Sequence, residues 1–348
     1  MRTFFNKDKS NCVFKNNYNL IDGNKMFFYA LICGILMTVV STILFTLISG
    51  IIGISYAELA SSRFGNYYSI IIMAIVYFCL FIFYNKKNKI NPVDELGIKN
   101  KVNVWFLLIS VMLGVCCIFL LAPFVNLLFD LFKIEGQPLP YEMNSWYSII
   151  LGIIGYAVLP AISEELIFRG VIQSGAKKRF TPVLTVFFST ACFTLMHGSL
   201  QQTFYQIVLG MVAGVLFYFS KNILYPIIFH FLNNFSVVIF ELVGMPNYLQ
   251  EGYFNYSTAW GVIAPILLLL LCSGLFLAVY FLLKHISKKV NTNTEFIMEG
   301  ENIIYEEQSQ KLSFKNFISG QTSTEKTYFV FAFVIALVMW ISNTIEMF

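Results

Sequence analysis

Residues 160–170 read PAISEELIFRG and place two glutamates and an arginine inside a long apolar stretch. On a helix, Glu165 and Arg169 stand four positions apart, so they share a face and can form an ion pair. Glu164 is rotated by about 100° from Glu165 around such a helix and points elsewhere. Each charge costs roughly 2.5–3.5 kcal/mol near the centre of a bilayer. A purely structural core seldom carries three such charges, so we interpret this stretch as a functional site.

The composition around this stretch is typical of a polytopic membrane protein. Of the 348 residues, 57% are hydrophobic and 12% are charged, and Phe alone occurs 37 times. A soluble chain of this length carries about twice that charged fraction. The expected fold class is therefore all-α, a polytopic transmembrane helical bundle.

Nine segments are candidates for membrane spans, because a spanning helix needs about 20 apolar residues. The second, fifth and sixth of these segments are short, and the fourth is longer than a bilayer needs. The segments are Met26–Ile54, Tyr67–Tyr84, Val104–Phe132, Trp146–Ala176, Thr181–Met196, Thr203–Phe219, Ile223–Val243, Ala259–Leu283 and Tyr328–Met347.

The loops between these segments alternate in charge. One set of loops holds only Arg63 and Lys133. The other set is rich in basic residues, among them Lys25, Lys86, Lys87, Lys89, Lys99, Lys101, Lys177, Lys178, Arg179, Lys221, Lys284, Lys288 and Lys289. By the positive-inside rule, the N-terminus is expected in the cytosol together with the loop at 284–327.

Two histidines and an asparagine belong to the apolar segments. His197 ends the fifth segment within FTLMHG, and His230 lies in the seventh within HFLNNF, with Asn234 four residues later. Counted at 1.5 Å per residue from the cytosolic span ends, Glu164 lies roughly 20 Å deep and His197 roughly 24 Å. His230 and Asn234 lie roughly 10 and 16 Å deep, a spread that leaves their convergence open. A single His or Asn in a span is often a packing residue, but this set on three spans favours a chemical site.

Such a set of side chains allows hydrolysis. A carboxylate shielded from water can act as a general base. Neutral imidazoles can orient a water, donate to an oxyanion or bind a metal, and Asn can donate to an oxyanion. Arg169 would hold Glu165 ionised and leave Glu164 free to act.

Three motifs in this part of the chain resemble those of a known family. EELIFR matches E-E-x-x-x-R, FTLMH matches F-x-x-x-H, and HFLNN matches H-x-x-x-N. In that order, on successive membrane segments, they are similar to the motifs of the CAAX-protease and bacteriocin-processing family of intramembrane endopeptidases. The resemblance covers about Trp146–Val243 and implies a catalytic core of four helices. It divides the chain into an N-terminal tail with three accessory spans (1–145), the core (146–243) and C-terminal spans with a cytosolic loop (244–348).

The resemblance also implies a role for each site residue. Glu164 would activate a water molecule that His197 helps to position. His230 and Asn234 would stabilise the oxyanion, and Glu165 with Arg169 would orient the site. The family is described both as metalloproteases and as glutamate peptidases without metal, and two His with one Glu would suffice as ligands of a catalytic zinc. No cofactor is required by the sequence, and we favour metal-free activation of water because no HExxH helix is present.

The sequence therefore predicts an intramembrane endopeptidase that cleaves a membrane-associated protein or peptide, of CAAX type or in bacteriocin or signal-peptide processing. A proton-coupled transporter and a non-catalytic bacteriocin-immunity protein are the alternatives. Transporters often contain internal repeats, and none is evident. The expected partners are the peptide substrate and the lipid bilayer, and nucleic acid is not expected. The expected location is a bacterial cell membrane.

Overall fold

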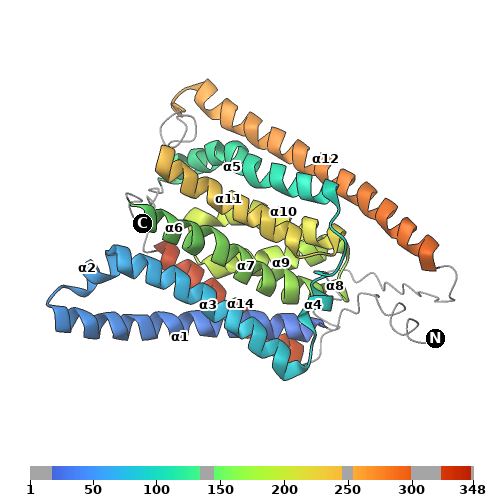
Figure 1. The fold of residues 1–348 in the computed structure, drawn as a ribbon. Helices are drawn as coiled ribbons and strands as arrows, with labels where there is room; N and C mark the ends of the chain where they lie inside the picture. The colour runs from blue at the N-terminus through green and yellow to red at the C-terminus, as the bar shows by residue number, and fades with distance from the viewer. Residues whose placement is uncertain (1–17, 134–144, 245–253, 299–322, 346–348) are drawn as a thin grey trace.

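The computed structural model describes residues 18–133, 145–244, 254–298 and 323–345, and these residues contain helices and no strand (Figure 1). The all-α fold is thereby confirmed, and the chain is an integral membrane protein with multiple apolar helices. The helices are α1 (Leu20–Ile52), α2 (Tyr56–Ser61), α3 (Arg63–Asn88), α4 (Pro92–Glu95), α5 (Val104–Phe132), α6 (Trp146–Gly152), η1 (Ile153–Val158), α7 (Leu159–Glu165), η2 (Leu166–Gln173), α8 (Ser174–Lys177), α9 (Pro182–His197), α10 (Leu200–Ser220), α11 (Leu224–Val243), α12 (Ala259–Met298) and α14 (Ser323–Ile345).

Eight helices within the described residues are long and apolar enough to cross a membrane, and they correspond to eight of the nine expected segments. The remaining segment is α9, a helix of 16 residues. At 1.5 Å per residue it measures about 24 Å, which is less than the hydrocarbon core of about 30 Å. Helix α9 therefore belongs to the bundle without having the full length of a span.

Helix α12 extends beyond the end that hydropathy indicated. The apolar segment stops at Leu283, whereas the helix continues for fifteen residues to Met298. A helix can continue into water because its backbone hydrogen bonds are internal, and hydropathy marks only its apolar part. The start of the expected loop at 284–327 is thus helical. Residues 299–322 of that loop lie outside the described residues, as do residues 1–17 of the N-terminal tail.

The fourth segment is one continuous helical run, Trp146–Lys177, interrupted by two π-helical stretches. The first, η1, ends at Val158, just before Pro160. Proline has no N–H and its ring crowds the carbonyl four residues back, so a wider turn there relieves the helix. The second, η2, carries Arg169. Stretches of π-helix inside α-helices are frequent at functional sites.

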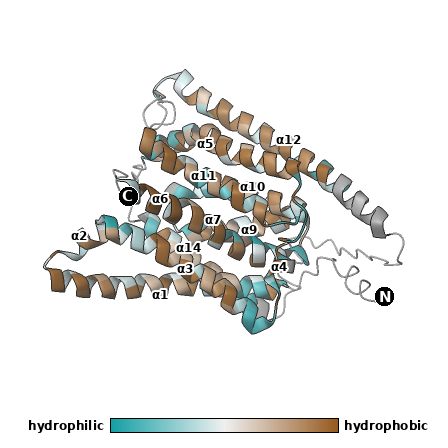
Figure 2. Cartoon of the chain, viewed as in Figure 1, coloured by the Kyte–Doolittle hydropathy of each residue, from teal (hydrophilic) through white to brown (hydrophobic). Residues whose placement is uncertain are grey.

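This interrupted run lies in the middle of the bundle (Figure 1). On one side, α5 packs against α11 and α12, and on the other side α1 packs against α3 and α14. The run itself contacts α1, α3, α9, α10 and α11. Apolar residues cover most of the outer helices, and hydrophilic residues gather where α3 ends and α4 begins (Figure 2). Exposed apolar side chains such as Leu47 and Leu270 suit contact with lipid.

Candidate active site

The Glu165–Arg169 ion pair expected from the sequence is present at the centre of the bundle. Arg169 Nη1 donates to Glu165 Oε1 at 2.8 Å, and both side chains are fully buried. The same carboxylate oxygen lies 2.9 Å from Nδ1 of His230 on α11. Glu165 therefore links the fourth segment to α11 through one oxygen. A buried carboxylate needs such partners, because an isolated ion would be strongly destabilised.

Glu164 faces the two histidines. Its Oε2 atom lies 3.9 Å from Nε2 of His197 and 3.9 Å from Nε2 of His230. The Glu164 and His197 side chains are 19% and 18% exposed, whereas the Glu164 Oε2 atom itself is buried, so the cluster is largely shielded from its surroundings. Oε2 has no hydrogen-bond partner among the described residues. The structure thus brings together three groups whose depths, counted along the sequence, left convergence open.

The partners of the two Nδ1 atoms decide which ring nitrogens carry protons. His197 Nδ1 lies 2.9 Å from the carbonyl oxygen of Phe193, and His230 Nδ1 contacts the Glu165 carboxylate. The Phe193 carbonyl oxygen and an ionised Glu165 carboxylate can only accept hydrogen bonds. Each histidine therefore carries a proton on Nδ1 and donates it. In the neutral form of each ring, Nε2 then presents a lone pair. Both lone pairs lie on the side of Glu164.

The ring of Phe193 contacts three members of the site. The F-x-x-x-H motif includes Phe193 but does not indicate these contacts. The Arg169 guanidinium lies 4.6 Å from the centroid of its ring. The rings of His197 and His230 approach the same ring at centroid distances of 4.7 and 6.0 Å. Phe193 is fully buried. It stabilises the buried cation through its π face and keeps water away from the ion pair.

Arg169 also anchors the fourth segment to α10. Its Nη2 donates to the carbonyl oxygen of Gly210 at 3.1 Å, and one turn later Gln173 Nε2 donates to the carbonyl oxygen of Gly214 at 2.7 Å. A Cβ added at Gly210 would lie 2.9 Å from Thr190 Cγ2, and one at Gly214 would lie 2.9 Å from Val186 Cγ1. Glycine is therefore required at both positions for α9 and α10 to approach each other.

Asn234 is placed by a different contact from those of the histidines. Its Nδ2 donates to the carbonyl oxygen of Tyr156 at 3.1 Å. In an α-helix the donor to that oxygen would be the N–H of residue 160, which is a proline without one. Asn234 thus supplies a donor that Pro160 cannot. An amide has two N–H groups, so one further donor of Asn234 is left by this contact.

Helix α14 reaches the turn that follows His197. Asn343 Nδ2 donates to the carbonyl oxygen of Gly198 at 2.7 Å, and Trp340 Nε1 donates to Thr203 Oγ1 at 2.8 Å. Gly198 caps α9 in the left-handed conformation at φ 58°. No local pattern indicates this contact, because 145 positions separate Asn343 from Gly198.

The site does not have the geometry of a closed zinc centre. Bonds of about 2.0–2.2 Å to tetrahedral zinc place the ligand atoms about 3.4 Å apart. Glu164 Oε2 lies 3.9 Å from each histidine Nε2. Among the described residues, no group of three His, Cys, Asp or Glu side chains could hold a metal ion. The zinc alternative, and with it the term metalloprotease, is not supported.

The part of the chain that carries the three motifs matches a family model. Residues 146–236 match the family model described as type II CAAX prenyl endopeptidase Rce1-like. This part of the chain is similar to the Rce1-like family. Every site residue described above except Asn343 and Trp340 lies in the Rce1-like segment.

A curated relative matches a similar length of chain. It is the Bacillus subtilis (strain 168) protein named "Putative membrane peptidase YdiL", which is 28% identical over 104 residues. The match covers 30% of this chain and 43% of that protein, so the chain spans less than half the length of this relative. No solved structure matches the chain.

Proposed function

We propose that this protein is an intramembrane endopeptidase in which Glu164 activates a water molecule. The observation that carries the proposal is the position of Glu164 Oε2, 3.9 Å from both histidine Nε2 atoms and without a hydrogen-bond partner among the described residues. A separation of that size is too long for a direct hydrogen bond and is suited to a bridging water. The name of the curated relative and the family of the core support a peptidase.

In the proposed reaction, Glu164 takes a proton from the water while the water oxygen bonds to the carbonyl carbon of the substrate. The carbon–nitrogen bond then breaks, and Glu164 returns that proton to the leaving amine. No atom is left over: one water adds across one peptide bond. Glu165 Oε1 is committed to Arg169 and His230, and its side chain is fully buried. Glu164 is the carboxylate whose oxygen faces both histidine Nε2 atoms, so we assign this transfer to Glu164.

The oxyanion needs a donor, and the tautomers limit which group can provide it. His230 Nε2 presents a lone pair when the ring is neutral, so it donates only after gaining a second proton. His230, supported by the Glu165 carboxylate at Nδ1, and the second N–H of Asn234 are the donors that we propose.

The test is cleavage by purified protein in detergent or lipid nanodiscs. A panel of membrane peptides, including peptides with a prenylated C-terminal cysteine, is incubated with wild type and Glu164→Gln, and products are identified by mass spectrometry. Cleavage by wild type that is lost in Glu164→Gln supports the proposal. Proton-dependent uptake into vesicles without cleavage would favour the transporter alternative.

A further inference from the structure

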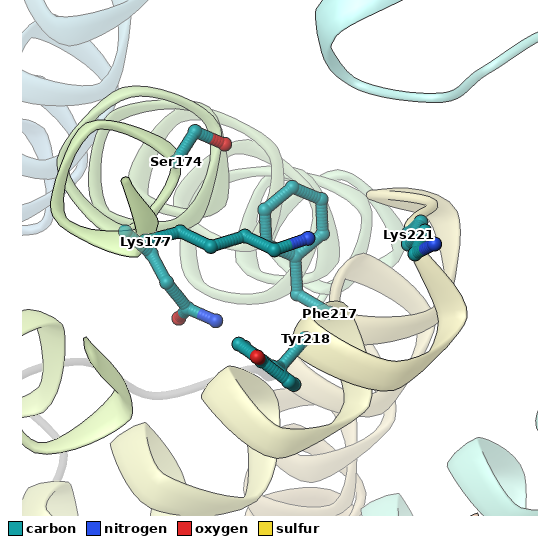
Figure 3. A pocket seen from close by; sticks show the side chains of 6 residues that line it. Ser174, Lys177, Phe217, Tyr218 and Lys221 are labelled. Atoms are coloured by element: carbon teal, nitrogen blue, oxygen red, sulfur yellow. The ribbon is translucent and has the colours of Figure 1, made fainter. Parts of the chain in front are cut away.

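A second site, a pocket with a largely apolar wall, lies at the basic end of the bundle, away from the acidic and histidine cluster. It is a small pocket between the end of α8 and the end of α10 (Figure 3). It has room for about one water-sized group. The residues that line it are Gln173, Ser174, Lys177, Phe217, Tyr218 and Lys221.

Two lysines from different elements border this pocket. Lys177 is the last residue of α8, and its side chain extends across the pocket toward Phe217 (Figure 3). The Lys177 ammonium lies 5.2 Å from the centroid of the Tyr218 ring. Lys221 caps α10 in the left-handed conformation at φ 51°, and its side chain lies on the opposite side of the pocket (Figure 3). Two cations on one pocket indicate an anionic ligand.

Gln173, which lines the pocket, has a buried hydrogen-bond acceptor without a partner among the described residues. Its side chain is 2% exposed, and Nε2 donates to the carbonyl oxygen of Gly214. Because a carbonyl only accepts, this contact fixes the orientation of the amide. The Oε1 atom is left buried without a hydrogen-bond partner among the described residues. A buried acceptor is costly when unpaired, so a hydroxyl in the pocket would be stabilised there.

We propose that this pocket binds the headgroup of an anionic phospholipid that carries a hydroxyl beside its phosphate. The phosphate lies at the mouth between Lys177 and Lys221, and the hydroxyl enters to donate to Gln173 Oε1. Basic pockets between membrane helices bind acidic headgroups. Tyr218 suits this position, because tyrosine is enriched at the interface between hydrocarbon and headgroups.

Binding of this lipid would stabilise the contact between the fourth segment and α10. Arg169 and Gln173 already donate to the backbone of α10 at Gly210 and Gly214. A headgroup between Lys177 and Lys221 continues that contact to the ends of both helices. The lipid therefore binds the folded bundle preferentially and raises its thermal stability by mass action.

The experiment measures thermal unfolding of the delipidated full chain in a neutral detergent. Phosphatidylglycerol provides a phosphate and hydroxyls, phosphatidylmethanol has the same charge without hydroxyls, and phosphatidylcholine is neutral overall. All three carry the same acyl chains. We expect phosphatidylglycerol to raise the unfolding midpoint by about 2–4 °C more than either of the others. Native mass spectrometry of the wild type should show one retained phosphatidylglycerol.

The matched variants are Lys177→Gln/Lys221→Gln and Lys86→Gln/Lys178→Gln, which remove the same charge from the same end of the protein. The first pair should abolish the difference between the lipids, and the second pair, of exposed lysines, should retain it. If both double variants lose the difference in unfolding midpoint equally, net charge alone explains the effect, and the proposal is overturned. So would an equal response to phosphatidylmethanol, or the full effect from soluble glycerol phosphate without lipid.

Discussion

At the residue scale, the two adjacent glutamates have different surroundings. Substitution of Glu164 should lower turnover, and substitution of Glu165 should lower stability. Glu164→Gln keeps the side-chain shape but removes the base, so turnover should fall by about 10²–10⁴-fold with little change in unfolding temperature. Glu165→Gln weakens the buried contacts to Arg169 and His230. It should lower the free energy of unfolding by about 3–5 kcal/mol, because the guanidinium is left uncompensated.

Turnover and thermal unfolding of the two variants in the same detergent check this difference. Equal unfolding midpoints for Glu164→Gln and Glu165→Gln would contradict the assigned surroundings. Full turnover by Glu164→Gln would remove it from the mechanism, whatever its stability.

Asn234 and Pro160 should be energetically coupled. Asn234→Ala leaves the Tyr156 carbonyl without the amide donor and should cost about 1–3 kcal/mol in a chain that retains Pro160. Pro160→Ala restores a backbone N–H, so the same Asn234 change should then cost less. A double-mutant cycle on unfolding free energies measures the difference.

Turnover in the same four proteins separates structure from chemistry. If Asn234 donates to the oxyanion, Asn234→Ala should reduce turnover by about 10²–10³-fold in both backgrounds. If the double variant Asn234→Ala/Pro160→Ala recovers turnover, the role of Asn234 is structural and consists of its contact with Tyr156.

Removal of metal should leave the proposed enzyme active. The 3.9 Å spacings around Glu164 are wider than a tetrahedral zinc site requires. If no metal ion takes part in the reaction, a chelator should change turnover by less than about twofold. Elemental analysis of wild type, His197→Ala and His230→Ala checks the metal content. Stoichiometric zinc that is lost in the histidine variants, and that restores activity after chelation, would refute the metal-free reaction.

At the scale of elements, α14 contributes to a site that otherwise belongs to the Rce1-like segment. Asn343→Ala removes a donor from the turn after His197, and Trp340→Phe removes a donor from Thr203 in the first turn of α10. Loss of about 1 kcal/mol in positioning corresponds to about a fivefold lower kcat for each, with KM nearly unchanged. Steady-state kinetics on a cleaved peptide provide the measurement.

Phe331→Leu is the control for α14, because Phe331 is 59% exposed on the same helix. It should leave kcat at the wild-type value. A similar fall in kcat for the control would mean that α14 acts through general stability, and unchanged kcat in the two donor variants would contradict a positioning role.

At the scale of the whole molecule, the charges of the loops predict its orientation. We propose that the basic end, where α8 and α10 finish, faces the cytosol, and that α2 lies outside. In a cysteine-free background, Ser61→Cys should react with an impermeant thiol reagent added to intact cells, and Lys178→Cys should react only after permeabilisation. Both native side chains are exposed. The reverse pattern of labelling would invert the topology.

The helices and the spacing of the motifs could be predicted because they depend on local patterns. Hydropathy located the apolar helices, and the four-residue spacing of Glu165 and Arg169 located their ion pair. The proposed division at residues 146 and 243 rests instead on the family resemblance of the three motifs and stays a prediction. The convergence of Glu164 with the histidines could not be predicted, because depth counted along straight helices ignores tilt and the π-helical turns.

Contacts between distant parts of the chain also could not be predicted from the sequence. Pro160 lacks the N–H that would donate to the Tyr156 carbonyl in an α-helix. Only the packing of α11 shows that Asn234 donates to this oxygen. Likewise, nothing local in α14 indicates that Asn343 caps the turn at Gly198. Such contacts depend on how helices are placed relative to one another.

The shortness of α9 has a consequence for the surrounding membrane. At about 24 Å, this helix is about 6 Å shorter than an average hydrocarbon core. Lipids beside it must thin, or headgroups and water must descend toward the end that carries His197, at a cost of a fraction of a kcal/mol per Å of mismatch. This hydrophobic mismatch would let the proposed hydrolytic site receive water without an open channel through the bundle. If the proposed site receives water in this way, its turnover should depend on bilayer thickness, and membranes with shorter acyl chains should favour the hydrated site.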